Sequence, residues 1–241
     1  TAGMPFASMN KHQRALLALA LILPAPLIGV SCSFYLQEWK SAIGDIEIGK
    51  AIWLLAKVWL IVLPVVWLLY VDGGKLSWSP TSKKGIVTGF IAAIPVGGVL
   101  LGTYFLAKDS LIDPGEAKQI IDELGLSSPA KFLIFASSMS LVNSLIEEYV
   151  WRWFVMRQCL KLMKPKAAIA GSALGFALHH VLAMQLYLSW TVTLVGALCI
   201  LLAGALWSWL FLRYRTIWPG WLSHALVDLA LFAVGYRLIF C

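Results

Sequence analysis

The sequence predicts an all-α protein, a polytopic membrane helical bundle with about seven transmembrane helices. Of the 241 residues, 60% are hydrophobic and only 13% are charged, a composition outside the range of ordinary soluble domains. The hydrophobic residues also gather into about seven runs of the roughly 20 residues that a helix needs to cross a bilayer. Little of the chain is left for a separate soluble domain.

Each apolar run sets the limits of one expected helix. Pro24 and Pro26 lie in the first run, where they should kink the helix because proline lacks an N–H donor. The second run contains Lys57, which could face the bundle interior but whose ammonium we expect to extend toward the nearer membrane surface. The third is rich in glycine and alanine, which suit close helix packing in lipid. In order, the spans are expected at about residues 15–36, 51–71, 85–107, 132–155, 167–188, 191–212 and 218–240.

We expect three parts along the chain. Residues 1–13 would form an N-terminal tail, whose opening Thr-Ala-Gly resembles a cloning remnant. Residues 14–130 would hold the first three membrane helices and a surface loop. Within that loop, segment 114–125 has Pro at its start and Gly at its end, as in a short amphipathic helix. Residues 131–241 would form the remaining helical core.

Basic residues alternate between the expected loops and predict an orientation. One set of loops is basic, while the intervening loops are acid-rich or almost uncharged. By the positive-inside rule, this places the N-terminus in the cytoplasm and the C-terminus outside. The net charge of +7 follows from this topology; because the basic residues form no continuous stripe, no nucleic-acid partner is expected. The basic loop residues are Lys11, Arg14, Lys75, Lys83, Lys84, Arg157, Lys161, Lys164, Lys166, Arg213 and Arg215.

Six acidic and imidazole side chains lie within the later spans, although an ionised group near the middle of a bilayer costs about 2.5 to 3.5 kcal/mol. Counting 1.5 Å per residue from the basic helix ends places four of these groups at depths of about 9 to 21 Å. The four are Glu147, His180, His224 and Asp228. These groups can therefore meet near the middle of the membrane. The six are Glu147, Glu148, His179, His180, His224 and Asp228.

Four-residue spacings place some of these groups on shared helix faces. Glu148 and Arg152 form one such pair, and His224 and Asp228 form another. The first is expected to be an internal ion pair, which leaves Glu147, about 100° around the helix, free to face elsewhere. A carboxylate facing imidazoles in a polar cavity can act as a general base toward water. On spacing alone, a structural polar network, a proton or ion pathway and a metal site remain alternatives.

Three motifs in order make this chain resemble a known family. The patterns EExxxR, FxxxH and HxxxN or HxxxD are matched by Glu147 to Arg152, by Phe176 to His180 and by His224 to Asp228. Together they look like the CPBP family, the CAAX-prenyl-protease and bacteriocin-processing group of glutamate-type intramembrane proteases. The resemblance begins near residue 132, so it implies that residues 131–241 are the catalytic helical core.

The resemblance implies an intramembrane endopeptidase without a cofactor or metal. Glu147 would activate water together with His180, while His224 and Asp228 would line the oxyanion site. Prenyl-processing members resemble this chain but carry Asn at the position of Asp228. Because an ionised carboxylate cannot donate a hydrogen bond, Asp228 must either be protonated or orient His224, and we expect the second.

Two further residues, Glu148 and Arg152, would support this geometry. His179, next to the motif histidine, should point about 100° away and be structural. The implied partners are the lipid bilayer and a membrane-associated protein or peptide substrate. The compact form with short loops suggests a bacterial inner (cytoplasmic) membrane, and the oligomeric state stays open.

Two other functions remain open at this stage. A non-catalytic scaffold or bacteriocin-immunity protein is one, because the same superfamily resembles a scaffold subunit of gamma-secretase and includes proteins linked to bacteriocin self-protection. A zinc-dependent membrane protease is the other, since the carboxylates and imidazoles are compatible zinc ligands. The HExxH spacing that places two ligands on one helical face is absent from the sequence.

Overall fold

The computed structural model describes residues 9–36, 47–76, 82–111 and 114–241, and over these residues its regular elements are helices. The opening Thr-Ala-Gly lies outside the described residues. Seven helical units of the described chain are long and apolar enough to cross a membrane, which confirms the predicted fold class. They cover Lys11–Tyr35, Ile48–Val71, Lys83–Phe105, Pro129–Leu162, Pro165–Gln185, Trp190–Tyr214 and Trp218–Phe240.

The first two spans pack together as a hairpin. The first span is divided at Leu23 and resumes with Pro24, so the interruption expected at the prolines is present. Gly29 of the first span lies against the Cβ of Ala56 in the second, so small residues allow a close approach. The elements are α1 (Lys11–Ile22), α2 (Pro24–Tyr35), α3 (Ile48–Val66) and the π-helical turn η1 (Trp67–Val71).

The third span and the polar segment after it lie close to where the sequence predicts them. α4 (Lys83–Leu111) is one long helix, and α5 (Pro114–Glu123) is the expected short one. After α5 the backbone turns at Gly125, whose φ of 72° favours glycine. The Leu126 N–H then donates to the Ile121 carbonyl, a bond that closes a helix end.

The fourth span is longer than expected and is not a regular α-helix. It runs over 34 residues, Pro129–Leu162, where the sequence predicted about 132–155. Two π-helical segments interrupt it, so its backbone hydrogen bonds change between the α-helical and the π-helical pattern while the helix continues. Its parts are α6 (Pro129–Ser137), η2 (Ser138–Asn143), α7 (Ser144–Glu148), η3 (Tyr149–Val155) and α8 (Met156–Leu162).

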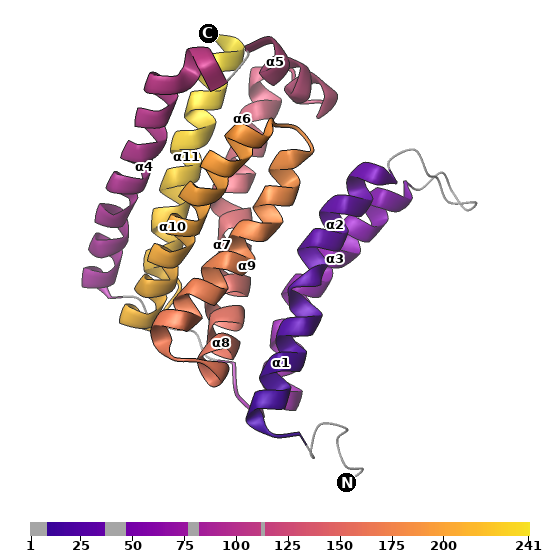
Figure 1. Cartoon of the computed structure of the whole chain (residues 1–241), viewed down its shortest axis with the longest axis vertical. Coiled ribbons are helices and arrows are strands. Elements are labelled where there is room, and N and C mark those ends of the chain that lie inside the picture. Colours follow the sequence, from indigo (N-terminus) through magenta and orange to yellow (C-terminus); the bar gives the residue numbers. More distant parts are fainter. Residues whose placement is uncertain (1–8, 37–46, 77–81, 112–113) are drawn as a thin grey trace.

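The last three spans are regular helices: α9 (Pro165–Gln185), α10 (Trp190–Tyr214) and α11 (Trp218–Phe240). Figure 1 shows α1, α2 and α3 on one side of the molecule and α4, α10 and α11 toward the other. The fourth span and α9 lie between these groups. α1 begins at the lower end of the bundle in this view, and α11 ends at the upper end.

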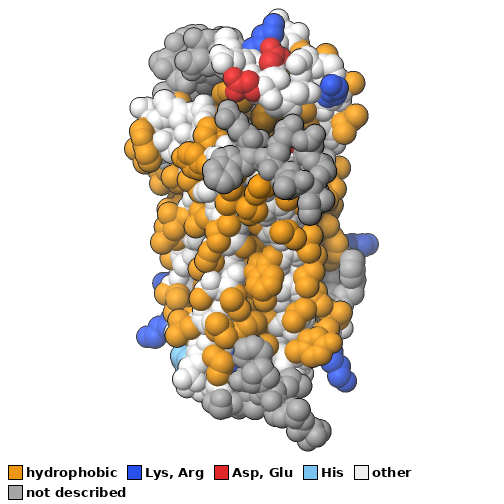
Figure 2. Space-filling view, turned by 90° about the vertical axis from the view of Figure 1, so that its right-hand side faces the viewer, with side chains coloured by type: hydrophobic (Ala, Val, Ile, Leu, Met, Phe, Trp, Pro, Cys, Tyr) orange, Lys and Arg blue, Asp and Glu red, His pale blue; other side chains and the backbone are white. Residues whose placement is uncertain are grey.

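The surface of the bundle is apolar, as expected for contact with lipid. Hydrophobic side chains cover most of the middle of the face shown in Figure 2, and its acidic side chains gather near one end. Five exposed residues come from five different helices and are each more than half exposed: Leu55, Ile94, Ile134, Leu174 and Leu202. The interior instead holds large aromatic residues, including Trp67, Trp151, Phe154, Phe176 and Trp207.

Side-chain contacts join the N-terminal hairpin to the fourth span. Lys161 Nζ lies 2.8 Å from Asp72 Oδ2, which ties α8 to the end of the second span. The Tyr149 hydroxyl donates to the Ile61 carbonyl at 2.8 Å. The hairpin is therefore fixed against the span that carries the adjacent carboxylates.

Gly89 provides a test of the packing between α4 and α11. A Cβ added there would overlap the Pro219 carbonyl oxygen, whereas one added at Gly98 on the same helix would meet nothing within 4 Å. We expect Gly89→Ala to destabilise the protein by about 1 to 3 kcal/mol through overpacking. Thermal unfolding in detergent should show a lower Tm for Gly89→Ala and an unchanged Tm for Gly98→Ala; equal values would contradict the packing described.

Candidate active site within the membrane

The adjacent carboxylates lie on α7, the short α-helical segment between the two π-helical segments. A π-helix bonds residue i to i+5, and such segments occur frequently at functional sites. Near η3, the Ser172 hydroxyl on α9 donates to the Trp151 carbonyl at 3.0 Å. This bond holds α9, which carries two histidines, against the fourth span.

Glu147 is turned toward histidines and not toward lipid. Its Oε2 lies 3.5 Å from His224 Nε2, and its Oε1 lies 3.8 Å from His179 Nε2. Its Oε1 also accepts a hydrogen bond from Asn143 Nδ2 at 2.9 Å. The side chain is 14% exposed, so the carboxylate is partly accessible and can meet a small reactant such as water.

His180 lies beside this carboxylate with one nitrogen already engaged. Its Nδ1 is 2.9 Å from the Phe176 carbonyl, and because a carbonyl only accepts, Nδ1 carries the proton. The Nε2 is then left as an acceptor. Glu147, His179 and His180 each place one candidate ligand atom within 4.8 Å of the others, a separation that one water molecule can bridge.

His224 has carboxylates at both ring nitrogens. Its Nδ1 donates to Glu148 Oε1 at 3.2 Å. Its Nε2 faces Glu147 Oε2 at 3.5 Å and Asp228 Oδ2 at 3.7 Å. The side chain is only 4% exposed, so this imidazole is held firmly and can carry a positive charge at low cost beside three acidic groups.

Glu148 and Arg152 form the ion pair that their spacing predicts. Arg152 Nε lies 3.4 Å from Glu148 Oε1, and both side chains are fully buried. The guanidinium lies over the rings of Phe176 and Trp207, at 4.5 and 5.3 Å from their centroids, where cation–π attraction adds to the pairing. A Cβ at Gly220 would come within 2.5 Å of Glu148 Oε2, so only glycine allows α11 to approach this closely.

Two tryptophans that no sequence motif predicts support the imidazoles. Trp207 stacks on His224 with centroids 3.9 Å apart, and its Nε1 donates to Ser223 Oγ at 3.1 Å. Trp151 stacks on His179 with an interplanar angle of 6°. Trp151 lies within the EExxxR motif, but at a position that the pattern leaves unspecified, and Trp207 lies in no motif.

Two side chains, those of His179 and Lys57, point in directions that differ from the expected ones. His179 was expected to point away from the site, but its ring stacks on Trp151 and reaches Glu147, because neighbouring side chains on a helix can converge through different rotamers. Lys57 was expected to extend to the membrane surface. It instead donates to Asn143 Oδ1 at 2.9 Å inside the bundle.

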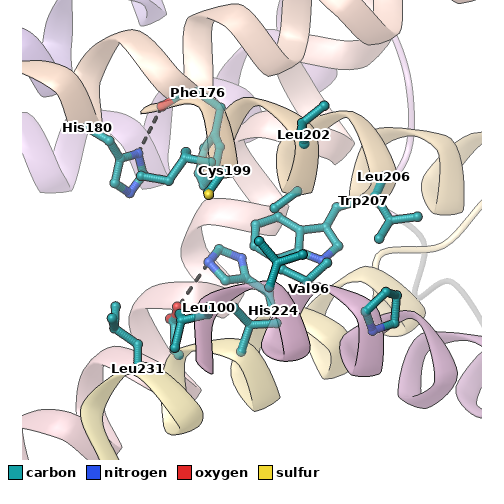
Figure 3. Close-up of a pocket in the computed structure, with 16 residues that line it drawn as sticks. Val96, Leu100, Phe176, His180, Cys199, Leu202, Leu206, Trp207, His224 and Leu231 are labelled. Carbon is teal, nitrogen blue, oxygen red and sulfur yellow. Dashed lines mark hydrogen bonds and ion pairs between the residues drawn. The ribbon is translucent and has the colours of Figure 1, made fainter. Parts of the chain in front are cut away.

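A cavity of about 370 Å³ adjoins the site, and residues from α4, α9, α10 and α11 surround it (Figure 3). Three polar residues, His180, His224 and Asp228, belong to its lining. Most of the other lining residues are apolar, such as Val96 and Leu206. Figure 3 shows His224 next to Trp207, and His180 bonded to the Phe176 carbonyl. The cavity can therefore hold an apolar group with polar chemistry at its wall.

Arg152→Met tests the buried ion pair. The substitution leaves the buried Glu148 carboxylate without the guanidinium that balances its charge, so the free energy of unfolding should fall by about 3 to 5 kcal/mol. Thermal unfolding in detergent measures this loss. Arg157→Met, at an exposed position on the same span, is the control and should change stability by about 0.5 kcal/mol or less.

Adding Glu148→Gln to Arg152→Met should recover part of the loss, because it removes the unpaired charge. A double variant less stable than Arg152→Met would contradict the pairing.

The matches to known proteins concern the part of the chain that holds the site. A family model described as type II CAAX prenyl endopeptidase Rce1-like matches residues 129–230. Comparisons with curated proteins and with solved structures found no match. The matched region contains all three motifs, and it supports an intramembrane protease of the CAAX type. Over residues 129–230, the chain is therefore similar to the CAAX prenyl endopeptidases, and this similarity supports membership of the CPBP family.

Proposed function

We propose that the protein is a glutamate-type intramembrane endopeptidase that hydrolyses a peptide bond of a membrane-associated protein or peptide. The main support is the convergence of Glu147, His180 and His224 from three separate membrane helices. The match to a CAAX prenyl endopeptidase model over residues 129–230 supports the reaction class. Such a cluster inside apolar spans is costly to maintain, and it favours a functional role.

In the proposed reaction, a water molecule lies between Glu147 and His180. Glu147 takes a proton from this water as the water oxygen forms a bond to the scissile carbonyl carbon. His180 orients the water through Nε2, which is free because Nδ1 donates to Phe176. Two acceptors from two helices would thus fix the position of the nucleophile.

His224 would stabilise the oxyanion that forms on the substrate. With Nδ1 donating to Glu148, a protonated Nε2 can donate to the developing negative charge. Asp228, 3.7 Å from this nitrogen, would orient the ring and stabilise its charge. When the C–N bond breaks, the proton held by Glu147 passes to the leaving amine, which restores the carboxylate.

The apolar cavity beside His224 would hold part of the substrate. Its volume of about 370 Å³ falls in the range of sites for small apolar groups, so a lipid-modified tail and an apolar peptide segment are both candidates. The segment between α4 and α6 would contribute to substrate choice. We further propose a bacterial inner membrane location, with a cytoplasmic N-terminus and an external C-terminus, because basic loops alternate with acid-rich or uncharged ones.

Glu147→Gln tests this function because it keeps the volume of the side chain and removes the base. Proteolysis should fall by about 10² to 10⁴-fold. The measurement is quantitative proteomics of membranes from cells with the wild-type protein or the variant, in which an uncleaved precursor should accumulate. Glu47→Gln, which removes a carboxylate paired with Lys50 at the start of the second span, is the control and should leave processing unchanged.

The same experiment addresses the scaffold or immunity alternative. A non-catalytic protein does not need a general base, so its effects in cells should survive Glu147→Gln. If no precursor accumulates and the wild-type phenotype persists, the peptidase proposal is wrong and the scaffold alternative is favoured.

A metal-dependent reaction is the second candidate, and one observation favours it. Glu147, His179 and His180 could supply three ligand atoms to one ion, as catalytic zinc sites require. The contacts of Glu147 with Asn143 and of His180 with the Phe176 carbonyl are also compatible with the metal-free mechanism. We prefer that mechanism because the three motifs resemble those of the CPBP family and the sequence contains no HExxH.

Metal removal separates the two mechanisms. We expect purified protein treated with a chelator and then freed of it to process the precursor that accumulates with Glu147→Gln at the wild-type rate, because a carboxylate base needs no ion. Elemental analysis of the same sample should find less than about one zinc per ten chains, against the one per chain of a catalytic site. Loss of activity that zinc restores would contradict the metal-free mechanism.

A further inference from the structure

We propose that Lys57, on α3, is a positioning residue that orients the Glu147 carboxylate through Asn143. This inference rests on the proposed function, in which Glu147 is the general base. Lys57 lies in the second span, outside residues 129–230, which match the family model. The N-terminal hairpin would thus contribute to the active site, in addition to its packing role.

Two short hydrogen bonds connect the three residues. Lys57 Nζ donates to Asn143 Oδ1 at 2.9 Å, and Asn143 Nδ2 donates to Glu147 Oε1 at 2.9 Å. All three side chains are partly buried, and the chain of bonds joins α3, η2 and α7. A displacement of Lys57 is therefore transmitted to the carboxylate through one amide.

The chemistry of the groups fixes the direction of this chain. An ammonium has only donors and an ionised carboxylate has only acceptors, while an amide has one of each at its two ends. Only one orientation of Asn143 satisfies both neighbours, with its oxygen toward Lys57 and its nitrogen toward Glu147. Lys57 therefore prevents the amide from turning its oxygen toward the carboxylate.

The consequence for Glu147 is that its two oxygens have separate roles. Oε1 is held by the Asn143 N–H, whereas Oε2 faces His224 Nε2 at 3.5 Å. A base whose one oxygen is anchored keeps the other directed at the reacting water. Without Lys57, Asn143 can rotate and the carboxylate loses this anchor.

The inward direction of Lys57 also needs an explanation, because lysines in membrane spans can extend to the surface. Its neighbours Leu55 and Val58 are exposed on the outside of α3, whereas its own ammonium points to Asn143 and lies 5.5 Å from the Trp53 ring centroid. Docking of α3 does not depend on this bond alone, since Tyr149 also donates to the Ile61 carbonyl of α3. These observations favour a role at the site.

The experiment uses the full-length protein and a peptide that spans the cleavage site of the precursor that accumulates with Glu147→Gln. We expect Lys57→Met to lower kcat by about 10 to 100-fold, the scale of a misplaced catalytic group, with KM within about threefold. Lys57→Arg, which also has only donors, should restore kcat to within about fivefold of the wild type. Asn143→Leu should be as slow as Lys57→Met, and the double variant no slower than Asn143→Leu.

Tyr149→Phe is the matched control because it removes a different bond between α3 and the fourth span and leaves Asn143 in place. It should lower Tm but leave kcat within about threefold, since one neutral hydrogen bond is worth about 1 kcal/mol. The proposal is overturned if Lys57→Met keeps wild-type kcat while Glu147→Gln is inactive. It is also overturned if Tyr149→Phe slows the reaction as much as Lys57→Met, because Lys57 then acts only by holding α3 against the fourth span.

A third result would separate this failure from that of the proposed function. If Glu147→Gln processes every membrane protein normally, Glu147 is not a base, and both the function and the positioning role are wrong. An inactive Glu147→Gln together with a fully active Lys57→Met removes the positioning role alone.

Discussion

The geometry of the site depends on one buried oxygen, Glu148 Oε1. Arg152 Nε lies 3.4 Å from it along the same span, and His224 Nδ1 donates to it from α11. A buried carboxylate with no partner would lower the stability of the fold, so the contacts of this oxygen favour close packing of the fourth span against α11. Gly220 makes that approach possible because it places no side chain against Glu148. The position of His224 then follows from this ion pair.

The rest of the site is arranged around His224 and the neighbouring Glu147. Trp207 of α10 covers one face of the His224 ring, and Ser223 holds the indole. α9 brings His180 to the edge of the same cavity. In this way each later span supplies at least one group, and apolar surroundings strengthen the interactions between them. The stability of the bundle and the geometry of the site are therefore set by the same contacts.

Much of this arrangement could be predicted from the sequence, because it depends on local rules. Hydropathy predicted the spans, and the i to i+4 spacing predicted the Glu148–Arg152 pair. The order of the motifs indicated the family, which the match over residues 129–230 supports. The prolines also predicted the break before α2. The roles of Glu147, His180, His224 and Asp228 in catalysis stay predictions.

What the sequence could not predict depends on contacts between distant segments or on local irregularity. Lys57 and Asn143 are 86 positions apart, so no pattern connects them, and a lysine in an apolar run looks the same whether it points inward or outward. The direction of His179 depends on its rotamer and on stacking with Trp151. The π-helical segments around α7 change the helical register, which an assumption of 100° per residue does not include.

The most direct test of the account asks which oxygen attacks the scissile carbonyl. A single turnover with excess enzyme in ¹⁸O-labelled water, followed by mass spectrometry, would locate the incorporated oxygen. If Glu147 activates water, one ¹⁸O should appear in the new C-terminal carboxyl group of the product and none in the peptide that contains Glu147. Incorporation of ¹⁸O into Glu147 would show that the carboxylate itself attacks the substrate, and it would contradict the role assigned to this residue.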